Sequence, residues 1–320
     1  MPFLEKLDVL EEGILKYNAA LLNILLKDRT TEKNIIWATS DYSYLGERFA
    51  PTDQILPSVI TGRHSKVIQP RSAKALEKQI LRTREKAEVF TPSWICNAQN
   101  NLIDDEWFGH SGSFNTELSN SWTVNPKKIS FPKDKRRDWK NYVDARRLEI
   151  ACGEAPYLVS RYDTVTAEII DLPSRIGLLD RKLRVVNENA SDEKEWLKWA
   201  FRAFESIYGF EYQGDNLLIA RENLLYTFID NLRYVLKRDP TINELQKIAT
   251  IISWNLWQMD GTTYRPPLYA LQRQGYQASI FDSYEETEMK ILCLESTPCK
   301  IKDWRTKEIV QYYSLIKGYK

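Results

Sequence analysis

The sequence is poor in residues that bind metals or form disulfide bridges. Its 320 residues include two histidines, His64 and His110, and four cysteines. Neither histidine neighbours a cysteine or a carboxylate at metal-ligand spacing, and the cysteines are not grouped in pairs. These absences argue against a zinc site and against a disulfide-stapled fold. We expect reduced thiols, as in a cytoplasmic protein.

Long hydrophobic runs and an excess of one charge are also lacking. No uninterrupted apolar stretch approaches the roughly 20 residues that a membrane-spanning helix needs, so we expect a soluble protein without a membrane partner. The 45 basic and 44 acidic residues leave a net charge of +1. A surface for nucleic acid must therefore be a local cluster of cations.

The patterns that are present predict a mixed α/β protein. Apolar residues at helical spacing over residues 3–27 predict a leading helix, which either packs on the main body or forms a short coiled coil between subunits. Residues 72–88 read as a charged helix. We expect three parts: a helical N-terminal lobe (1–108), a basic loop or junction (109–140) and an α/β core (141–320).

Within that core, strands and helices alternate. An apolar run enters a glycine turn at residues 148–153, and a second run, IYGFE, begins at Ile207. Helical spacing is predicted for three segments: 192–206, 216–237 and 243–254.

The residues 147–158, RLEIACGEAPYL, place a strand before a turn of small residues. This segment resembles the cofactor loop of DNA adenine-N6 methyltransferases of restriction–modification systems. The resemblance implies a Rossmann-like core that binds S-adenosylmethionine, with small residues that let the backbone approach the cofactor. It implies cofactor contacts by Glu149, Ala151, Cys152 and Gly153. Ala155 replaces the second glycine of the family pattern.

A segment before this loop resembles the same family. Residues 84–92, REKAEVFTP, are similar to the segment in which a Phe-Thr-Pro turn covers the amino-acid end of the cofactor. The resemblance makes Phe90, Thr91 and Pro92 candidates for the site. The alternative is an ordinary helix start, with Thr91 as cap and Pro92 as first helical residue.

Two later segments resemble the next strands of the family. In those enzymes a carboxylate after the second strand binds the ribose hydroxyls, which implies this role for Glu211. Glu211 lies farther from Gly153 than the usual step of about 20 residues, which indicates inserted helices between them. The third strand, in residues 251–260, implies that Asp260 meets the adenine amine. The alternative for Asp260 is a turn before Gly261, with the nearby tryptophans in the core.

The catalytic Asn/Asp-Pro-Pro-aromatic motif of the family is not found in the 320 residues. In the family this motif accepts the hydrogens of the adenine amine and stacks on the flipped base. Residues 265–269, RPPLY, have two prolines and an aromatic ring, but Arg265 accepts no hydrogen bond. Residues 301–316 resemble the strand that leads into the motif, so we expect the chain to stop before it.

Two functions are therefore expected as alternatives. The first is a methyltransferase subunit that binds S-adenosylmethionine and double-stranded DNA, and methylates adenine only if a second restriction–modification subunit supplies the motif. The second is a non-catalytic subunit that binds DNA or a partner.

Two basic tracts are the candidates for DNA contact, because phosphate neutralisation needs clustered cations. Solvated charged segments are the alternative interpretation. The cations of the two tracts are Arg82, Arg84, Lys86, Lys133, Lys135, Arg136, Arg137 and Lys140.

Overall fold

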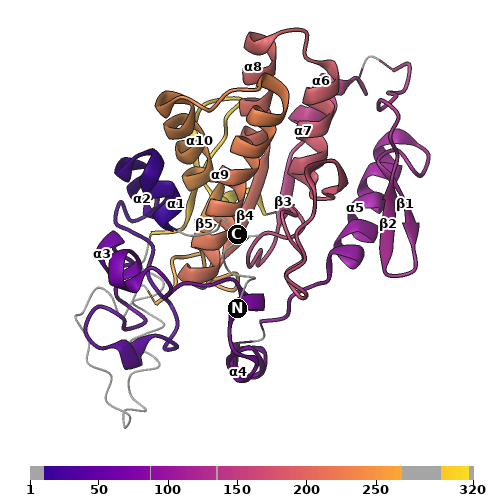
Figure 1. Cartoon of the computed structure of the whole chain (residues 1–320). Helices are drawn as coiled ribbons and strands as arrows, with labels where there is room; N and C mark the ends of the chain where they lie inside the picture. The colour runs from indigo at the N-terminus through magenta and orange to yellow at the C-terminus, as the bar shows by residue number, and fades with distance from the viewer. Residues whose placement is uncertain (1–10, 87, 135, 269–296, 317–320) are drawn as a thin grey trace.

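A small parallel sheet lies at the centre of a mixed α/β structure (Figure 1). The computed structural model describes residues 11–86, 88–134, 136–268 and 297–316. The sheet has the order β3-β4-β5, and β4 pairs in parallel with both neighbours. Its strands are β3 (Arg147–Glu149), β4 (Ile207–Glu211) and β5 (Leu256–Gln258).

The sheet strands follow the sequence pattern closely. All five residues of β4 are buried, as expected for a continuous apolar run inside a parallel sheet. The first strand ends at Glu149 and the chain then turns, with positive φ at Ala151 and Gly153, as the predicted run into a glycine turn at residues 148–153 requires. The third strand begins only at Leu256, because the preceding helix continues to Asn255.

Four helices pack on one face of the sheet, and their buried side chains form much of the hydrophobic core. The helices between β3 and β4, predicted as an insertion, are both present. Asp192 and Thr241 accept hydrogen bonds from the main-chain N–H groups of Glu195 and Glu244, which fixes the first turns of two helices. The four are α7 (Leu178–Asn189), α8 (Glu193–Glu205), α9 (Gly214–Leu236) and α10 (Ile242–Asn255).

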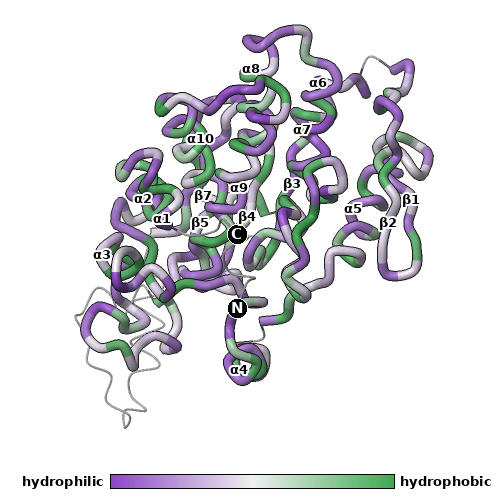
Figure 2. The backbone as a smooth tube through the Cα atoms, in the orientation of Figure 1, coloured by the Kyte–Doolittle hydropathy of each residue, from purple (hydrophilic) through white to green (hydrophobic). Residues whose placement is uncertain are grey.

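Hydropathy follows this arrangement. In Figure 2, hydrophilic and hydrophobic stretches alternate along α7, α8 and α10, as expected of helices with one buried face. None of the helices in the described part of the chain combines the length and the apolar character that crossing a bilayer requires.

The other face of the sheet is covered by a hairpin. Tyr208 of β4 and Trp257 of β5 share a buried cluster with Cys299 and Ile301. The expected strand over residues 301–316 is wrong: two short strands pair with each other antiparallel, because the chain turns back between residues 303 and 308. They are β6 (Lys300–Lys302) and β7 (Ile309–Gln311).

The N-terminal helices pack against the main body. The predicted leading helix is divided in its described part, because Asn18 takes an extended conformation and its side chain caps the next helix through the N–H of Ala20. Helix α2 packs on α10 and α9, which agrees with the packing interpretation. The two helices are α1 (Glu11–Tyr17) and α2 (Ala19–Leu26).

One continuous core joins the N-terminal part to the sheet. Leu22 and Leu25 belong to the same buried cluster as Leu217 and Leu256. The N-terminal lobe and the α/β core therefore share one hydrophobic core. The predicted domain boundaries at residues 108 and 140 stay predictions. The other helices are α3 (Pro57–Ile60), α4 (Leu76–Lys86), α5 (Ser93–Phe108) and α6 (Trp139–Asp144). Short 3-10 turns occupy Ser43–Leu45, Gly62–His64, Arg71–Ala73, Leu172–Ser174 and Tyr312–Leu315.

The segment 109–140, expected to be a loop, contains a β-hairpin. Its strands are β1 (Asn115–Leu118) and β2 (Ser121–Val124), paired antiparallel. Asn120 in the connecting turn has φ of 57°, a left-handed conformation that asparagine tolerates.

Candidate functional site

A cavity of about 1250 Å³ lies at the carboxyl ends of the three parallel strands. This is the edge at which open α/β sheets bind ligands. Segments far apart in the sequence line it. They lie within residues 38–40, 50–52, 84–91, 149–157, 210–216 and 259–268.

The turn after β3 forms one wall of the cavity. Ala151, Gly153 and Ala155 have φ of 48°, 53° and 64°. Left-handed φ suits glycine and costs an alanine about 1–2 kcal/mol. The turn is held against β4, since the N–H of Cys152 donates to the carbonyl oxygen of Phe210 at 2.8 Å. Ala155 therefore occupies a position that glycine would adopt more easily.

Glu149, the last residue of β3, lines the cavity but is almost fully buried. Its two carboxylate oxygens accept hydrogen bonds from the N–H groups of Tyr157 and Leu158, at 3.3 and 3.2 Å. Burial raises the pKa of Glu149 to about 8.

Glu211, the last residue of β4, links the end of β4 to the turn that follows β3. One oxygen accepts from the N–H of Gly153 at 2.9 Å and the other from the N–H of Gln213 at 3.1 Å. Burial raises the pKa of Glu211 to about 7. Glu149 and Glu211 thus place two carboxyl groups, readily protonated near neutral pH, in one cavity wall.

Cys152 lies between these carboxyl groups as an unreactive thiol. It is fully buried, and burial together with the charge of Glu149 raises the pKa of its thiol well above the usual value. A protonated thiol is a poor nucleophile. Its role is packing: a Cβ atom added to Gly209 of β4 would lie 3.3 Å from the Cys152 sulfur.

The Phe-Thr-Pro segment adjoins the turn at the cavity. The Phe90 ring would contact a Cβ atom on Gly153 at 3.5 Å, and the guanidinium of Arg71 lies 5.3 Å from the ring centroid. Thr91 also lines the cavity. Pro92 is not among its lining residues and takes the N-cap position of α5, so the predicted cap at Thr91 is one residue too early.

Asp260 adopts the turn that was its alternative interpretation. One carboxylate oxygen accepts from the N–H and the hydroxyl of Thr262, at 2.8 and 2.6 Å. Its neighbours Met259 and Gly261 line the cavity, whereas Asp260 does not. Trp257 is buried in the core, as the same interpretation predicts.

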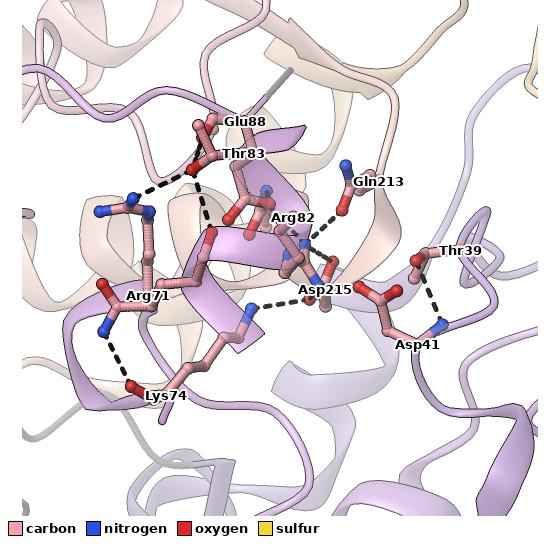
Figure 3. Close-up of polar contacts among 12 residues, drawn as sticks. Thr39, Asp41, Arg71, Lys74, Arg82, Thr83, Glu88, Gln213 and Asp215 are labelled. Carbon is pink, nitrogen blue, oxygen red and sulfur yellow. Dashed lines mark hydrogen bonds and ion pairs between the residues drawn. The ribbon is translucent and has the colours of Figure 1, made fainter. Parts of the chain in front are cut away.

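A buried ion-pair network holds α4 beside the cavity. In Figure 3, Arg82 points from α4 toward Asp215 at the start of α9, and Lys74 reaches the same carboxylate. Arg82 lies 2.9 Å from Asp215, 2.7 Å from Asp41 and 2.6 Å from Glu88, while Lys74 lies 3.0 Å from Asp215. Burial alone would raise the pKa of Asp215, but the charges of Lys74 and Arg82 hold it well below its usual value.

Arg82 is therefore not an exposed cation, and the prediction that it contacts DNA is wrong for this conformation. Its guanidinium is buried and paired with three carboxylates. Arg84, two residues later, is exposed and lines the cavity. The side chain of Lys86 lies outside the described residues.

The second basic tract lies at the other end of the sheet. It precedes α6 and β3, whereas α4 lies near the cavity (Figure 1). Lys133, Arg136 and Arg137 are exposed, and Lys135 lies outside the described residues. Lys140 pairs with Glu195 at 3.4 Å. Among the described residues, the two basic tracts therefore do not form one contiguous surface for DNA.

Several lining residues could not be found from the sequence. Thr39 and Pro51 come from the irregular N-terminal segment, which reaches the cavity because the N–H of Gly214 donates to the carbonyl oxygen of Trp37 at 3.0 Å. No local sequence pattern predicts this long-range contact. Asn216 was a better candidate, since a polar residue in the first turn of a helix after a strand commonly faces a ligand.

Within the described residues, no group of three or more His, Cys, Asp or Glu side chains is placed to hold a metal ion. The chain matches no family model, no curated protein and no solved structure. Its cavity must therefore be interpreted from its own residues.

Proposed function

We propose that this chain is a Rossmann-like, S-adenosylmethionine-binding subunit of a DNA adenine-N6 methyltransferase of the restriction–modification kind. One observation carries the proposal. Three segments that resemble the cofactor-binding parts of that family, represented by Phe90, Gly153 and Glu211, line one cavity at the carboxyl ends of parallel strands.

The chemistry of the cavity suits this cofactor. S-adenosylmethionine carries two cations, a sulfonium and an ammonium, and one carboxylate, beside a ribose and an adenine, so its net charge is positive. Glu149 and Glu211 supply carboxyl groups that have no ion pair among the described residues, and an ionised carboxylate attracts both cations. Aromatic residues also line the cavity, and an aromatic ring can contact a cation or adenine: Phe90, Tyr157 and Tyr212.

The size of the cavity leaves room for a second molecule. Its volume exceeds the range of about 300–1,000 Å³ that is common for small-molecule sites. The exposed Arg84 stands among the lining residues, where it can meet a phosphate of DNA. A cofactor and part of a nucleotide can thus share the site.

Methyl transfer requires a partner in this proposal, because the 320 residues hold no Asn/Asp-Pro-Pro-aromatic motif. The free edge of β3 offers a place for one, because among the described residues β3 pairs with β4 alone. On the free side of β5, by contrast, Arg221 donates to the carbonyl oxygen of Leu256 at 2.6 Å. A strand of a second polypeptide can extend the sheet beside β3, next to the cavity.

A non-catalytic binding subunit is the second candidate. Both oxygens of Glu211 are already used by main-chain N–H groups, and Asp260 is used by its own turn. Such contacts are also expected in a protein that keeps the fold of a methyltransferase but does not transfer a methyl group. In this case the chain holds DNA, the cofactor or a partner and transfers no methyl group.

The test combines a binding and an activity measurement. Calorimetric titration of S-adenosylmethionine should show binding to the wild type and weaker binding to Glu211→Ala. The control Glu308→Ala, at an exposed site on the hairpin, should bind like the wild type. Absence of binding by the wild type would overturn the cofactor proposal, and equal binding by Glu211→Ala would remove Glu211 from the site.

The activity arm measures transfer of labelled methyl groups to mixed-sequence duplex DNA. The isolated chain should be inactive, since each missing transition-state acceptor typically costs factors of about a hundred to a thousand. Robust transfer by the chain alone would falsify the requirement for a partner.

A further inference from the structure

A second concave surface lies on α8, at the end of the sheet opposite the cofactor cavity (Figure 1). It has a volume of about 880 Å³ and is lined by residues of α8 together with Lys247 of α10. The half-buried rings of Trp199 and Phe201 line it. Trp139 of α6 extends the aromatic surface, since its ring centroid lies 5.1 Å from that of Trp199. We call this surface the α8 groove.

Lysine ammonium groups lie over these rings. Lys247 is 3.8 Å from the centroid of Phe201, and Lys198 is 5.9 Å from that of Trp199. Lys140 lies over both tryptophans, 5.2 Å from Trp139 and 5.6 Å from Trp199. Each ring of the groove therefore has a cation beside its face.

The carboxylates of the α8 groove are already neutralised by arginines. Glu193 pairs with Arg238 at 2.7 Å, and Glu205 pairs with Arg202 at 3.1 Å. Three exposed lysines that line the groove, Lys194, Lys198 and Lys247, have no ion pair among the described residues. The surplus charge of the groove is thus positive, although the whole chain is nearly neutral.

We propose that the α8 groove binds single-stranded nucleic acid, with bases stacked on Trp199 and Phe201 and phosphates between the lysines. Aromatic faces combined with cations that follow a backbone are the features of sites for single strands. A duplex keeps its bases stacked inside, so it can use the lysines but not the rings.

The lysines do not block the rings. Lys198 and Lys247 are exposed, with long flexible side chains, and a cation–π contact at an exposed site is weak. An arriving base can take the ring face while the ammonium group moves to a neighbouring phosphate. Lys140 connects the groove with Arg136 and Arg137, which extends the path for a strand. The proposal does not depend on the cofactor cavity.

The test uses fluorescence anisotropy with a labelled twelve-residue oligothymidylate. The double variant Lys198→Glu/Lys247→Glu should bind at least tenfold more weakly than the wild type. Loss of two phosphate contacts should also reduce the slope of log affinity against log salt by about 1.4, at roughly 0.7 per contact. The matched control Lys33→Glu/Lys66→Glu makes the same charge change at exposed lysines elsewhere, and should keep wild-type binding.

A second arm separates stacking from charge. Trp199→Leu should weaken oligothymidylate binding about fivefold or more, while binding of inorganic polyphosphate of similar charge stays unchanged. All variants are first compared with the wild type by thermal unfolding. The proposal is overturned if the groove variants bind like the control. Equal weakening of oligothymidylate and polyphosphate binding by Trp199→Leu also contradicts it, and so does equal weakening of oligothymidylate and duplex binding by the same substitution.

Discussion

The carboxylate of Glu211 accepts a hydrogen bond from the main-chain N–H of Gly153, with 2.9 Å between the two atoms. This contact joins the end of β4 to the turn after β3, across 58 residues of sequence. Burial raises the pKa of Glu211 to about 7 and that of Glu149 to about 8. The wall of the cavity therefore changes its charge within the physiological pH range.

Binding of S-adenosylmethionine should strengthen as the pH rises from 6 to about 7.5, below the pKa of the ammonium group of the ligand itself. A cationic ligand favours the ionised carboxylates, and below pH 7 to 8 Glu211 and Glu149 must first release their protons. For one proton the affinity changes by at most about tenfold per pH unit. Calorimetry in buffers with different ionisation enthalpies should detect proton release, and Glu211→Gln should flatten the profile. An affinity independent of pH would contradict this assignment.

The strands and long helices of the core could be predicted because their signals are local. The run at Ile207 is apolar throughout and becomes β4, and helical spacing gave α9 and α10 to within two residues at either end. The small residues around Gly153 indicated a turn, and the chain does turn there with positive φ. Local preference and tertiary packing agree at these places.

Other features depend on contacts between distant residues. The ion pair between Arg82 and Asp215 spans 133 residues, so Arg82 looked like a free cation in the sequence. Each strand of the hairpin β1–β2 has only four residues, and apolar residues alternate with polar ones only at Trp122 and Val124 of β2. Two positions are too few to separate a strand from a loop in the sequence. Asp260 before Gly261 fits both a turn and a cofactor contact, and only the hydrogen bonds to Thr262 distinguish the two.

Arg82→Met should destabilise the fold by about 3–5 kcal/mol, because Asp215 and Glu88 would keep buried charges without their main partner. Urea denaturation gives the change in the free energy of unfolding. The matched control is Arg84→Met, two residues along the same helix at an exposed position, which should change stability by no more than about 0.5 kcal/mol. Equal effects of the two substitutions would show that the network does not hold α4.

Glu222→Gln should stabilise the protein at alkaline pH. Glu222 of α9 and Glu11 of α1 are both buried, and their carboxylate oxygens have no hydrogen-bond partner among the described residues. Burial raises the pKa of Glu11 to about 8, and burial with the charge of Glu11 raises that of Glu222 well above its usual value. Both groups contribute stability at low pH that is lost as the pH rises through their folded pKa values.

The expected gain for Glu222→Gln is roughly 1–3 kcal/mol at pH 9 and close to zero at pH 5, where the wild-type carboxyl groups are protonated. Urea denaturation at the two pH values measures it. Glu308→Gln, at an exposed position, serves as the control and should show no such difference. A gain of the same size at both pH values would mean that charge burial is not its cause.

Arg136→Ala/Arg137→Ala should weaken binding of duplex DNA to a similar extent for unrelated sequences. Both side chains are exposed in the segment before α6, and contacts to phosphate carry no sequence information. Loss of two such contacts should reduce the slope of log affinity against log salt by about 1.8, at roughly 0.9 per phosphate. Arg84→Ala removes an exposed arginine at the opposite end of the sheet and so tests the other tract. If only Arg84→Ala weakens duplex binding, the DNA lies at the cofactor cavity and residues 133–140 are a solvated loop; if only the double variant does, the duplex is held away from the cavity.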